Sequence, residues 1–169
     1  HLAACSQFAQ WDNRSYDSTL CIGRNFDFYF GDDFSKNKII EFVKPDSGIN
    51  FAFITWGGMI GVVSGMNEQG LTVTINAGTL ELGRKASTPV TLVAREILQY
   101  AATIDEAIAI ASTRRISVSE TFLIGSANEN RAILIEKKPG AQAEFESDSS
   151  VLLCTNHFQA NSFVSEDKN

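Results

Sequence analysis

Cys5 is the first residue of the sequence whose side chain could break a covalent bond. A thiol is only a few per cent ionised at neutral pH, and it becomes an effective nucleophile when a base or a cation lies beside it. Histidine is the usual base, and of the two histidines in the chain His157 could form a dyad with Cys5. The alternative is that Cys5 is a buried strand residue without chemistry.

The Cys5 thiol could also be deprotonated by a base other than histidine. If the peptide bond between Ala4 and Cys5 were cleaved, the new α-amine, with an ordinary pKa of about 8, could deprotonate its own thiol. The small residues Ala3 and Ala4 permit the backbone strain that such a self-cleavage requires. The residues alone therefore leave the base open between His157 and the amine of Cys5.

Arg24 and Asp27 lie close together near the end of an apolar β-run. A charged pair beside the nucleophile could orient the amine and favour the thiolate. The same pair exposed at the surface would contribute little to stability or function.

Asn76 and Asn156 each follow an apolar run, so both are expected at the ends of strands. An amide in that position could donate a hydrogen bond to a developing oxyanion, a contribution of roughly 3 kcal/mol. An asparagine at a strand end is more often a turn former. Phe28 and Trp56 could line an apolar pocket for an acyl group, although aromatic residues are more often part of the core.

The remaining cysteines, Cys21 and Cys154, lie inside apolar runs, and both are predicted to be buried and inert. The three cysteines have no metal-ligand spacing, and their odd number leaves at least one free thiol. The net charge of −6 argues against nucleic acid as a partner, because no basic patch is expected to displace counterions from phosphates. No apolar run approaches the roughly 20 residues needed to span a membrane.

Alternating and apolar runs predict mostly strands in the first part of the chain. Turn signals at 45–48 and 67–70 separate them. The expected strands cover 5–11, 18–28, 39–43, 49–56, 61–66 and 71–77.

The apolar spacing then changes to a helical period. Pro89 suits the first position of a helix that is expected to run to about Ala101. A second helix is expected to begin at Thr103, which forms a capping box with Glu106. Two amphipathic helices with a short link predict an antiparallel pair that lies on a sheet.

Strands return at 121–126, 131–137, 143–146 and 151–155. Strand runs on both sides of a helical pair predict an α+β fold with antiparallel sheets. Because one helix pair covers only one face of a sheet, a second sheet or further helices are expected on the other.

Several short motifs follow one another in a characteristic order. They are CSQF at 5–8, GRNFDF at 23–28, GMNEQGL at 65–71, TINA at 74–77 and TNHF at 155–158. Together they resemble the N-terminal-nucleophile cysteine hydrolases, above all the acyl-CoA:6-aminopenicillanate acyltransferase-like group. Bile salt hydrolases, penicillin V acylases and acid ceramidase are more distant relatives of that group.

The resemblance implies an αββα sandwich, in which two antiparallel sheets lie between helical layers. This sequence is expected to contain only part of that sandwich. It also implies that Cys5, once freed as the N-terminal residue, attacks a small-molecule amide without any cofactor. Arg24 and Asp27 then contact the nucleophile, and the backbone N–H of Asn76 and the side chain of Asn156 stabilise the oxyanion.

The resemblance places His157 in a structural or substrate-binding role, with Phe28 and Trp56 as further candidates for substrate binding. Residues 1–4 are expected to be a propeptide-like remnant ahead of a catalytic core at 5–169. A chain that starts without methionine and ends in a polar tail indicates a piece of a longer protein, with a leader that would favour export from a bacterial cell.

Relatives carry more sheet and helix, so a C-terminal segment or a second chain is expected to complete the fold. The sequence leaves open whether the protein forms a homo-oligomer. A Cys5–His157 thiol hydrolase and a non-catalytic or unprocessed relative remain as alternative functions.

Overall fold

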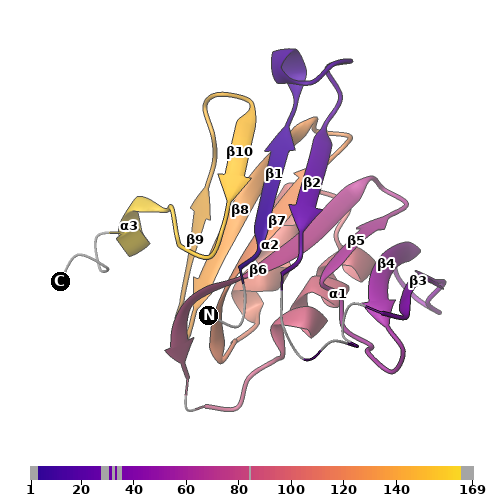
Figure 1. Ribbon diagram of the computed structural model, residues 1–169, viewed down its shortest axis with the longest axis vertical. Helices are drawn as coiled ribbons and strands as arrows, with labels where there is room; N and C mark the ends of the chain where they lie inside the picture. Colours follow the sequence, from indigo (N-terminus) through magenta and orange to yellow (C-terminus); the bar gives the residue numbers. More distant parts are fainter. Residues whose placement is uncertain (1–3, 28–30, 32, 34–35, 84, 165–169) are drawn as a thin grey trace.

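Two antiparallel sheets packed face to face form the framework of the protein (Figure 1). The computed structural model describes residues 4–27, 31, 33, 36–83 and 85–164. The smaller sheet has the order β10 (Val151–Cys154), β1 (Ser6–Gln10), β2 (Cys21–Asn25). The larger sheet has the order β3 (Lys38–Val43), β4 (Phe51–Trp56), β5 (Ser64–Asn67), β6 (Leu71–Leu82), β7 (Val118–Ser126), β8 (Arg131–Lys138), β9 (Ala141–Phe145).

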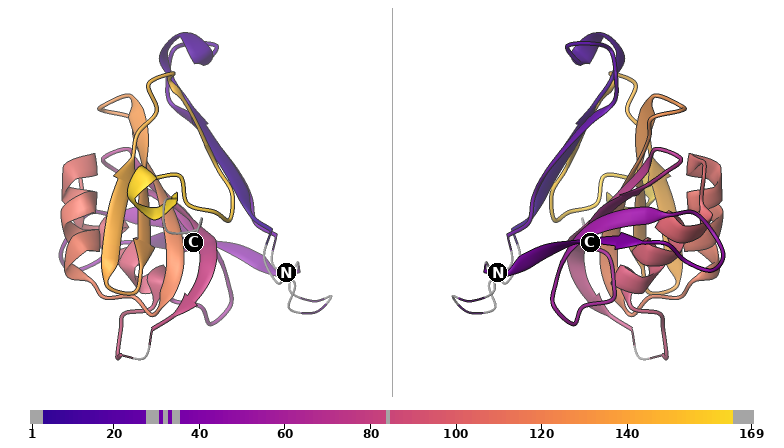
Figure 2. Two further views of the ribbon diagram at one scale, coloured as in Figure 1. Left: turned by 90° about the vertical axis from the view of Figure 1, so that its left-hand side faces the viewer. Right: turned by 90° about the vertical axis from the view of Figure 1, so that its right-hand side faces the viewer.

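Helices α1 (Val90–Tyr100) and α2 (Ile104–Thr113) form a pair on the outer face of the larger sheet. The 3₁₀ helix η1 (Asp12–Arg14) and the short helix α3 (Asn161–Val164) lie at the periphery. Figure 2 shows that the two sheets approach each other near η1 and diverge toward the end of β1 at which the chain begins. None of the described helices is long and apolar enough to cross a membrane.

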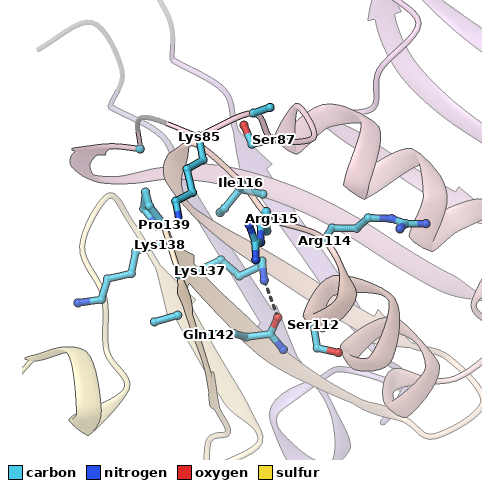
Figure 3. Close-up of a pocket in the computed structure, with 14 residues that line it drawn as sticks. Lys85, Ser87, Ser112, Arg114, Arg115, Ile116, Lys137, Lys138, Pro139 and Gln142 are labelled. Carbon is cyan, nitrogen blue, oxygen red and sulfur yellow. Dashed lines mark hydrogen bonds between the residues drawn. The ribbon is translucent and has the colours of Figure 1, made fainter.

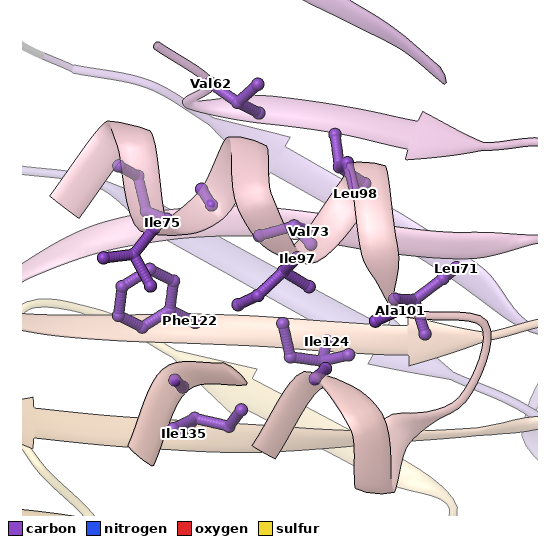
Figure 4. Packing of buried hydrophobic residues seen from close by; sticks show 14 of the residues in the cluster. Val62, Leu71, Val73, Ile75, Ile97, Leu98, Ala101, Phe122, Ile124 and Ile135 are labelled. Carbon is purple, nitrogen blue, oxygen red and sulfur yellow. The ribbon is translucent and has the colours of Figure 1, made fainter. Parts of the chain in front are cut away.

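The main hydrophobic core lies between the helix pair and the larger sheet (Figure 4). Alternate residues of β6 and β7, among them Val73 and Ile124, point toward Ile97 of α1. The two-residue period of the strands and the 3.6-residue period of the helix therefore meet in one apolar layer. Each fully buried large side chain of this kind contributes about 1.5–3 kcal/mol relative to its exposed state.

A second apolar cluster fills the space between the two sheets. It contains Ala9, Trp11, Leu123, Ala132, Leu134, Leu152 and Cys154. These residues come from β1, the turn after it, β7, β8 and β10. This cluster joins the N-terminal and C-terminal strands of the chain to the centre of the larger sheet.

Buried Asn67 connects the β5–β6 hairpin to the end of α1. Its amide nitrogen donates to the carbonyl oxygens of Leu98 at 2.9 Å and Ala101 at 2.7 Å. Its side-chain oxygen accepts from the backbone N–H of Gln69 at 3.1 Å and of Leu71 at 3.0 Å. One asparagine therefore satisfies both the hairpin turn and two carbonyls at the C-terminus of the helix, which otherwise lack partners.

The helix starts differ slightly from the predictions. Pro89 is extended and lies just before α1, which begins at Val90, so its expected place inside the first turn is wrong by one residue. The capping box at α2 forms: the Thr103 hydroxyl accepts from the Glu106 N–H at 3.2 Å. The Glu106 carboxylate reaches one residue further back and accepts from the Ala102 N–H at 2.7 Å.

Strand lengths differ more than strand positions. Strand β6 continues to Leu82 and β7 begins at Val118, because the two strands pair from Leu71 to Ala77 and again, after an irregularity in register, at Leu82 and Val118. Residues 61–63 are not part of a strand, since the Val62 N–H donates to the Thr91 carbonyl at 2.9 Å, at the start of α1. Both effects depend on partners distant in sequence.

The expected α+β class with antiparallel sheets is confirmed. The helix pair, the larger sheet and the smaller sheet provide three layers of the expected αββα sandwich. Within the described ranges, no helix covers the outer face of the smaller sheet, where Leu153 is 64% exposed.

Candidate active site

Cys5 lies immediately before β1, at the end where the two sheets diverge. It is only 4% exposed, and its sulfur lies 3.8 Å from the carbonyl oxygen of Asp27. The Ala4 N–H donates to the same oxygen at 2.9 Å. The backbone just after β2 therefore holds the chain on both sides of the Ala4–Cys5 peptide bond.

Arg24 of β2 extends its guanidinium across to the larger sheet. One terminal nitrogen donates to Ser64 Oγ at 2.7 Å, and the other donates to the carbonyl oxygen of Ile75. The guanidinium carbon also lies 4.5 Å from the centre of the Phe26 ring. Burial lowers the pKa of Arg24, whereas electrostatic interactions with Cys5 and Glu120 raise it.

Arg24 and Asp27 do not form the expected charged pair among the described residues. The Arg24 guanidinium instead uses Ser64 and a backbone carbonyl, both neutral. Asp27 is exposed and approaches Cys5 through its backbone oxygen rather than its carboxylate. The end of β2 turns the two side chains apart, so their closeness in sequence does not bring their charges together.

Glu120 is a carboxyl group near Arg24 that the sequence did not single out. It is 5% exposed, and burial raises its pKa to about 8, while Arg24 acts in the opposite direction. At neutral pH the carboxyl is therefore mostly protonated. The positive charge of Arg24 is then not neutralised by Glu120.

Asn76 of β6 is fully buried, and its side chain crosses to the smaller sheet. Its amide nitrogen donates to the carbonyl oxygens of Thr155 at 3.2 Å and Cys154 at 3.5 Å. Asn156 forms the reciprocal connection, since its amide nitrogen donates to the Ala77 carbonyl at 2.8 Å. The two asparagines thus join β6 to the segment that follows β10. The backbone of Asn76 is part of the β6–β7 ladder.

Several buried polar atoms around this end have no hydrogen-bond partner among the described residues. They include Nε2 of Gln7, Nε of Arg24 and Oδ1 of Asn76. Gln7 is opposite Arg24 in the sheet register, and its side-chain oxygen accepts from the Thr74 hydroxyl. Most buried polar groups in proteins have partners, so a group of exceptions in one place indicates a functional site.

Glu136 fixes the segment that follows Asn156. Its two carboxylate oxygens accept from the Gln159 N–H at 2.7 Å and the Ala160 N–H at 2.9 Å. Burial raises its pKa, while these two hydrogen bonds and His157 act in the opposite direction. The only signal in the sequence was an acidic residue inside the apolar run of β8.

The remaining site candidates have other partners or lie outside the described residues. His157 is exposed, and its Nδ1 lies 2.7 Å from the Thr155 hydroxyl. Half-buried Trp56 stacks at a tilt on Phe26, with ring centres 5.6 Å apart, and so extends the aromatic surface beside Arg24. Phe28 lies outside the described residues.

The other two cysteines have different environments. Cys154 is buried as predicted, and burial raises the pKa of its thiol to about 11. Cys21 is exposed, so its predicted burial is wrong. Cys21 opens β2, and the strand alternation directs Ile22 toward the inter-sheet cluster and Cys21 outward. Among the residues described, no group of three or more histidine, cysteine or acidic side chains is placed to bind a metal ion.

This architecture is that of the N-terminal-nucleophile hydrolases. A Caenorhabditis elegans ortholog of N-acylethanolamine-hydrolyzing acid amidase superposes with a TM-score of 0.74 and 16% identity, covering 97% of this chain and 77% of that one. Conjugated bile acid hydrolase from Clostridium perfringens gives 0.65 and 14%, covering 96% and 56%. Penicillin V acylase from Agrobacterium tumefaciens gives 0.62 and 16%, covering 88% and 51%.

The chain thus spans little more than half the length of the bile acid hydrolase and the penicillin acylase. No curated protein matches the sequence. The profile of the acyl-coenzyme A:6-aminopenicillanic acid acyl-transferase family matches residues 13–169, and the chain belongs to that family. With its family and fold, the chain is an enzyme of the class of hydrolases and acyltransferases that act on carbon–nitrogen bonds.

Proposed function

We propose that Cys5 accepts the acyl group of a linear amide and passes it to water or to an acceptor amine. The observation that carries this proposal is the position of the Cys5 sulfur, which is buried and interacts with the Arg24 guanidinium. That cation has neutral hydrogen-bond partners and a largely protonated carboxyl as its acidic neighbour.

The active form in this proposal begins at Cys5, with residues 1–4 as a propeptide and 5–169 as the core. The Cys5 sulfur attacks the Ala4 carbonyl, the peptide bond to the Cys5 nitrogen breaks, and a thioester forms. Water then hydrolyses the thioester, which releases the Ala4 carboxylate and restores the thiol beside a free amine. The contacts of the Asp27 carbonyl support this step, because they fix the backbone N–H of Ala4 and the thiol of Cys5 on either side of the bond that breaks.

In turnover, the free amine takes the thiol proton and the sulfur attacks the substrate carbonyl. The backbone N–H of Asn76 and the side chain of Asn156 stabilise the oxyanion in this proposal. An amide NH₂ group carries two N–H donors, so Asn156 keeps one while it binds Ala77. The ammonium returns its proton to the leaving amine, and water or an acceptor amine then attacks the thioester. His157 has no assigned proton-transfer role, since its ring binds Thr155.

The substrate is proposed to carry an apolar acyl group, because Phe26 and Trp56 form an aromatic surface beside Arg24. The relatives act on N-acylethanolamines and conjugated bile acids, and one is a penicillin V acylase. The panel to be tested therefore contains N-acyl amino acids, acylated β-lactams, bile-acid conjugates and fatty amides. A C-terminal segment or second chain that covers the smaller sheet is part of the same proposal.

Intact-mass analysis and N-terminal sequencing of the active protein test the processing step. The expected active species starts at Cys5, and an active species that retains residues 1–4 would show that the amine is not the base. The Cys5→Ala variant is expected to stay unprocessed and inactive, whereas Cys154→Ala serves as the control. Turnover by Cys5→Ala, or no labelling of Cys5 by a thiol-directed acylating probe, would refute the assignment.

A further inference from the structure

A cavity of about 590 Å³ lies beside the helix pair, beyond the ends of β6 and β8 (Figure 3). Residues from the segment before α1, the segment after α2 and the β8–β9 hairpin line it. Lys137 lies here on the same face of β8 as Ile135 and Ile133 of the helix-side core. The cavity therefore lies on the helix side of the larger sheet, whereas Cys5 lies just before β1 of the smaller sheet.

Five cationic side chains line the cavity, and the described lining residues include no acidic one. Figure 3 shows Lys85, Arg115 and Lys137 directed toward the space between them. The other two point away: Arg114 donates to Glu96 at 2.6 Å, and the Lys138 ammonium lies 4.7 Å from the centre of the Phe163 ring.

The three converging cations lack ion-pair partners in the part of the chain that the structure describes. Lys137 is only 4% exposed, and its ammonium donates to the neutral side-chain oxygen of Gln142 at 2.9 Å. Gln142 in turn donates to the Glu144 carboxylate at 2.8 Å. Burial lowers the pKa of Lys137, whereas Glu144 acts in the opposite direction. Glu120 is opposite Lys137 in the β7–β8 register, but the two form no ion pair in the described part of the chain.

An arrangement of this kind is unfavourable without an anion. Like charges that converge repel each other, most strongly where they are buried as at Lys137, and a buried ammonium without an ion-pair partner is destabilising. The chain has a net charge of −6, so these cations do not follow from a generally basic composition. The expectation that no basic patch exists is therefore wrong locally, because residues 85, 115 and 137 are brought together only by the fold.

We infer that this cavity binds a phosphate-bearing small molecule. The planar guanidinium of Arg115 can donate two parallel hydrogen bonds to phosphate oxygens, and Lys85 and Lys137 supply point charges around them. Three cations suit a ligand with several negative charges better than a single carboxylate. The volume falls within the range of roughly 300–1,000 Å³ typical of small-molecule sites, so it accommodates an organic group as well.

Isothermal titration calorimetry on the full chain tests the inference with orthophosphate, pyrophosphate, adenosine 5′-diphosphate and adenosine. Pyrophosphate and adenosine diphosphate are expected to bind, more weakly as salt increases, and adenosine is not. The exposed pair Lys85 and Arg115 is replaced in a K85Q/R115Q variant, which is expected to weaken binding at least about tenfold. Arg14→Gln removes one exposed positive charge in η1, away from the cavity, and is expected to leave affinity unchanged.

Tighter binding of adenosine diphosphate than of pyrophosphate supports a phosphorylated organic ligand, and equal binding supports free phosphate. The inference is overturned if no phosphate compound binds at millimolar concentration. It is equally overturned if K85Q/R115Q binds like the unchanged protein, or if Arg14→Gln weakens binding as much. Because the site is independent of the proposed nucleophile, Cys5→Ala is expected to bind these anions normally, whatever its catalytic activity.

Discussion

Cys5 and Cys154 are both buried thiols, yet their surroundings differ. Cys5 lies just before β1, and Cys154 is the last residue of β10, the strand paired with β1. Cys154 belongs to the apolar inter-sheet cluster, where burial raises the pKa of its thiol to about 11. Both thiols interact with the Arg24 guanidinium, Cys5 more strongly, and the carboxyl groups of Glu136 and Glu120 add to the raised pKa of Cys154. The difference teaches that two equally buried thiols can differ in the balance of charged groups around them, which burial alone does not decide.

The two regions also use their hydrogen bonds differently. The Cys154 thiol donates to its neighbouring backbone carbonyl, that of Thr155, at 3.5 Å, and the Asn76 amide nitrogen lies 3.7 Å from its sulfur. The Cys5 thiol instead interacts most strongly with Arg24, whose buried Nε has no hydrogen-bond partner among the described residues. An apolar region can be closed by packing alone. A catalytic region requires groups whose hydrogen bonds are completed only by a substrate.

The largest expected effect comes from exchanging each cysteine for alanine. Cys5→Ala is expected to lower kcat/KM at least about a thousandfold, since it removes the nucleophile. Cys154→Ala is expected to keep activity while losing about 1 kcal/mol of stability through lost packing. Kinetics and urea unfolding of both variants check this, and similar losses of activity in the two would remove the distinction between the regions.

The next effect concerns Glu120, the buried carboxyl group near Arg24. Burial raises its pKa from 4.5 to about 8, so the folded protein holds this proton more tightly than the unfolded chain. Its stabilising contribution is complete below pH 4.5 and is lost as the pH rises toward 8, at about 1.4 kcal/mol for each pKa unit.

The Glu120→Gln variant imitates the protonated carboxyl at every pH. Its free energy of unfolding is expected to lack this decline and to exceed that of the unchanged protein near pH 8, measured by urea unfolding across the pH series. Glu146→Gln, at an exposed carboxylate, is the control. Parallel pH profiles for Glu120→Gln and the unchanged protein would contradict the protonated state of Glu120.

Asn156→Ala is expected to lower kcat about a hundredfold, because it removes a proposed oxyanion donor. It also removes the hydrogen bond to Ala77 and should cost about 1 kcal/mol of stability. Thr155→Ala changes the neighbouring exposed residue and serves as the control, with activity within a few-fold of the unchanged protein. A kcat for Asn156→Ala equal to that of the control would remove Asn156 from the proposed site.

The smallest effect is expected from Glu136→Gln, which keeps the shape of the side chain and removes its charge. The hydrogen bonds from Gln159 and Ala160 lose their charge assistance, so kcat should fall about tenfold as the segment carrying Asn156 shifts. Steady-state kinetics against Glu146→Gln measure the effect. Unchanged kcat would show that Asn156 is positioned without Glu136.

Much of the framework follows from patterns within short windows of the sequence. The two-residue alternation predicted the strands, the helical spacing after Pro89 predicted the α1–α2 pair, and the turn signal at 67–70 predicted the β5–β6 hairpin. Motif order indicated the family that the profile match confirms. These features are readable because each depends on residues that lie near one another in the chain.

The tertiary structure decided features that depend on distant partners. It directed Cys21 outward and Cys154 inward, although both lie in apolar runs. It separated the Arg24 charge from the Asp27 carboxylate, raised the pKa of Glu120 by burial, and gathered Lys85, Arg115 and Lys137 around one cavity.

The sequence alone therefore identified Cys5 as the candidate nucleophile, through its motif and the order of the motifs that follow. Its difference from Cys154 came from the fold, because charge and desolvation act through space and their sources are far apart along the chain.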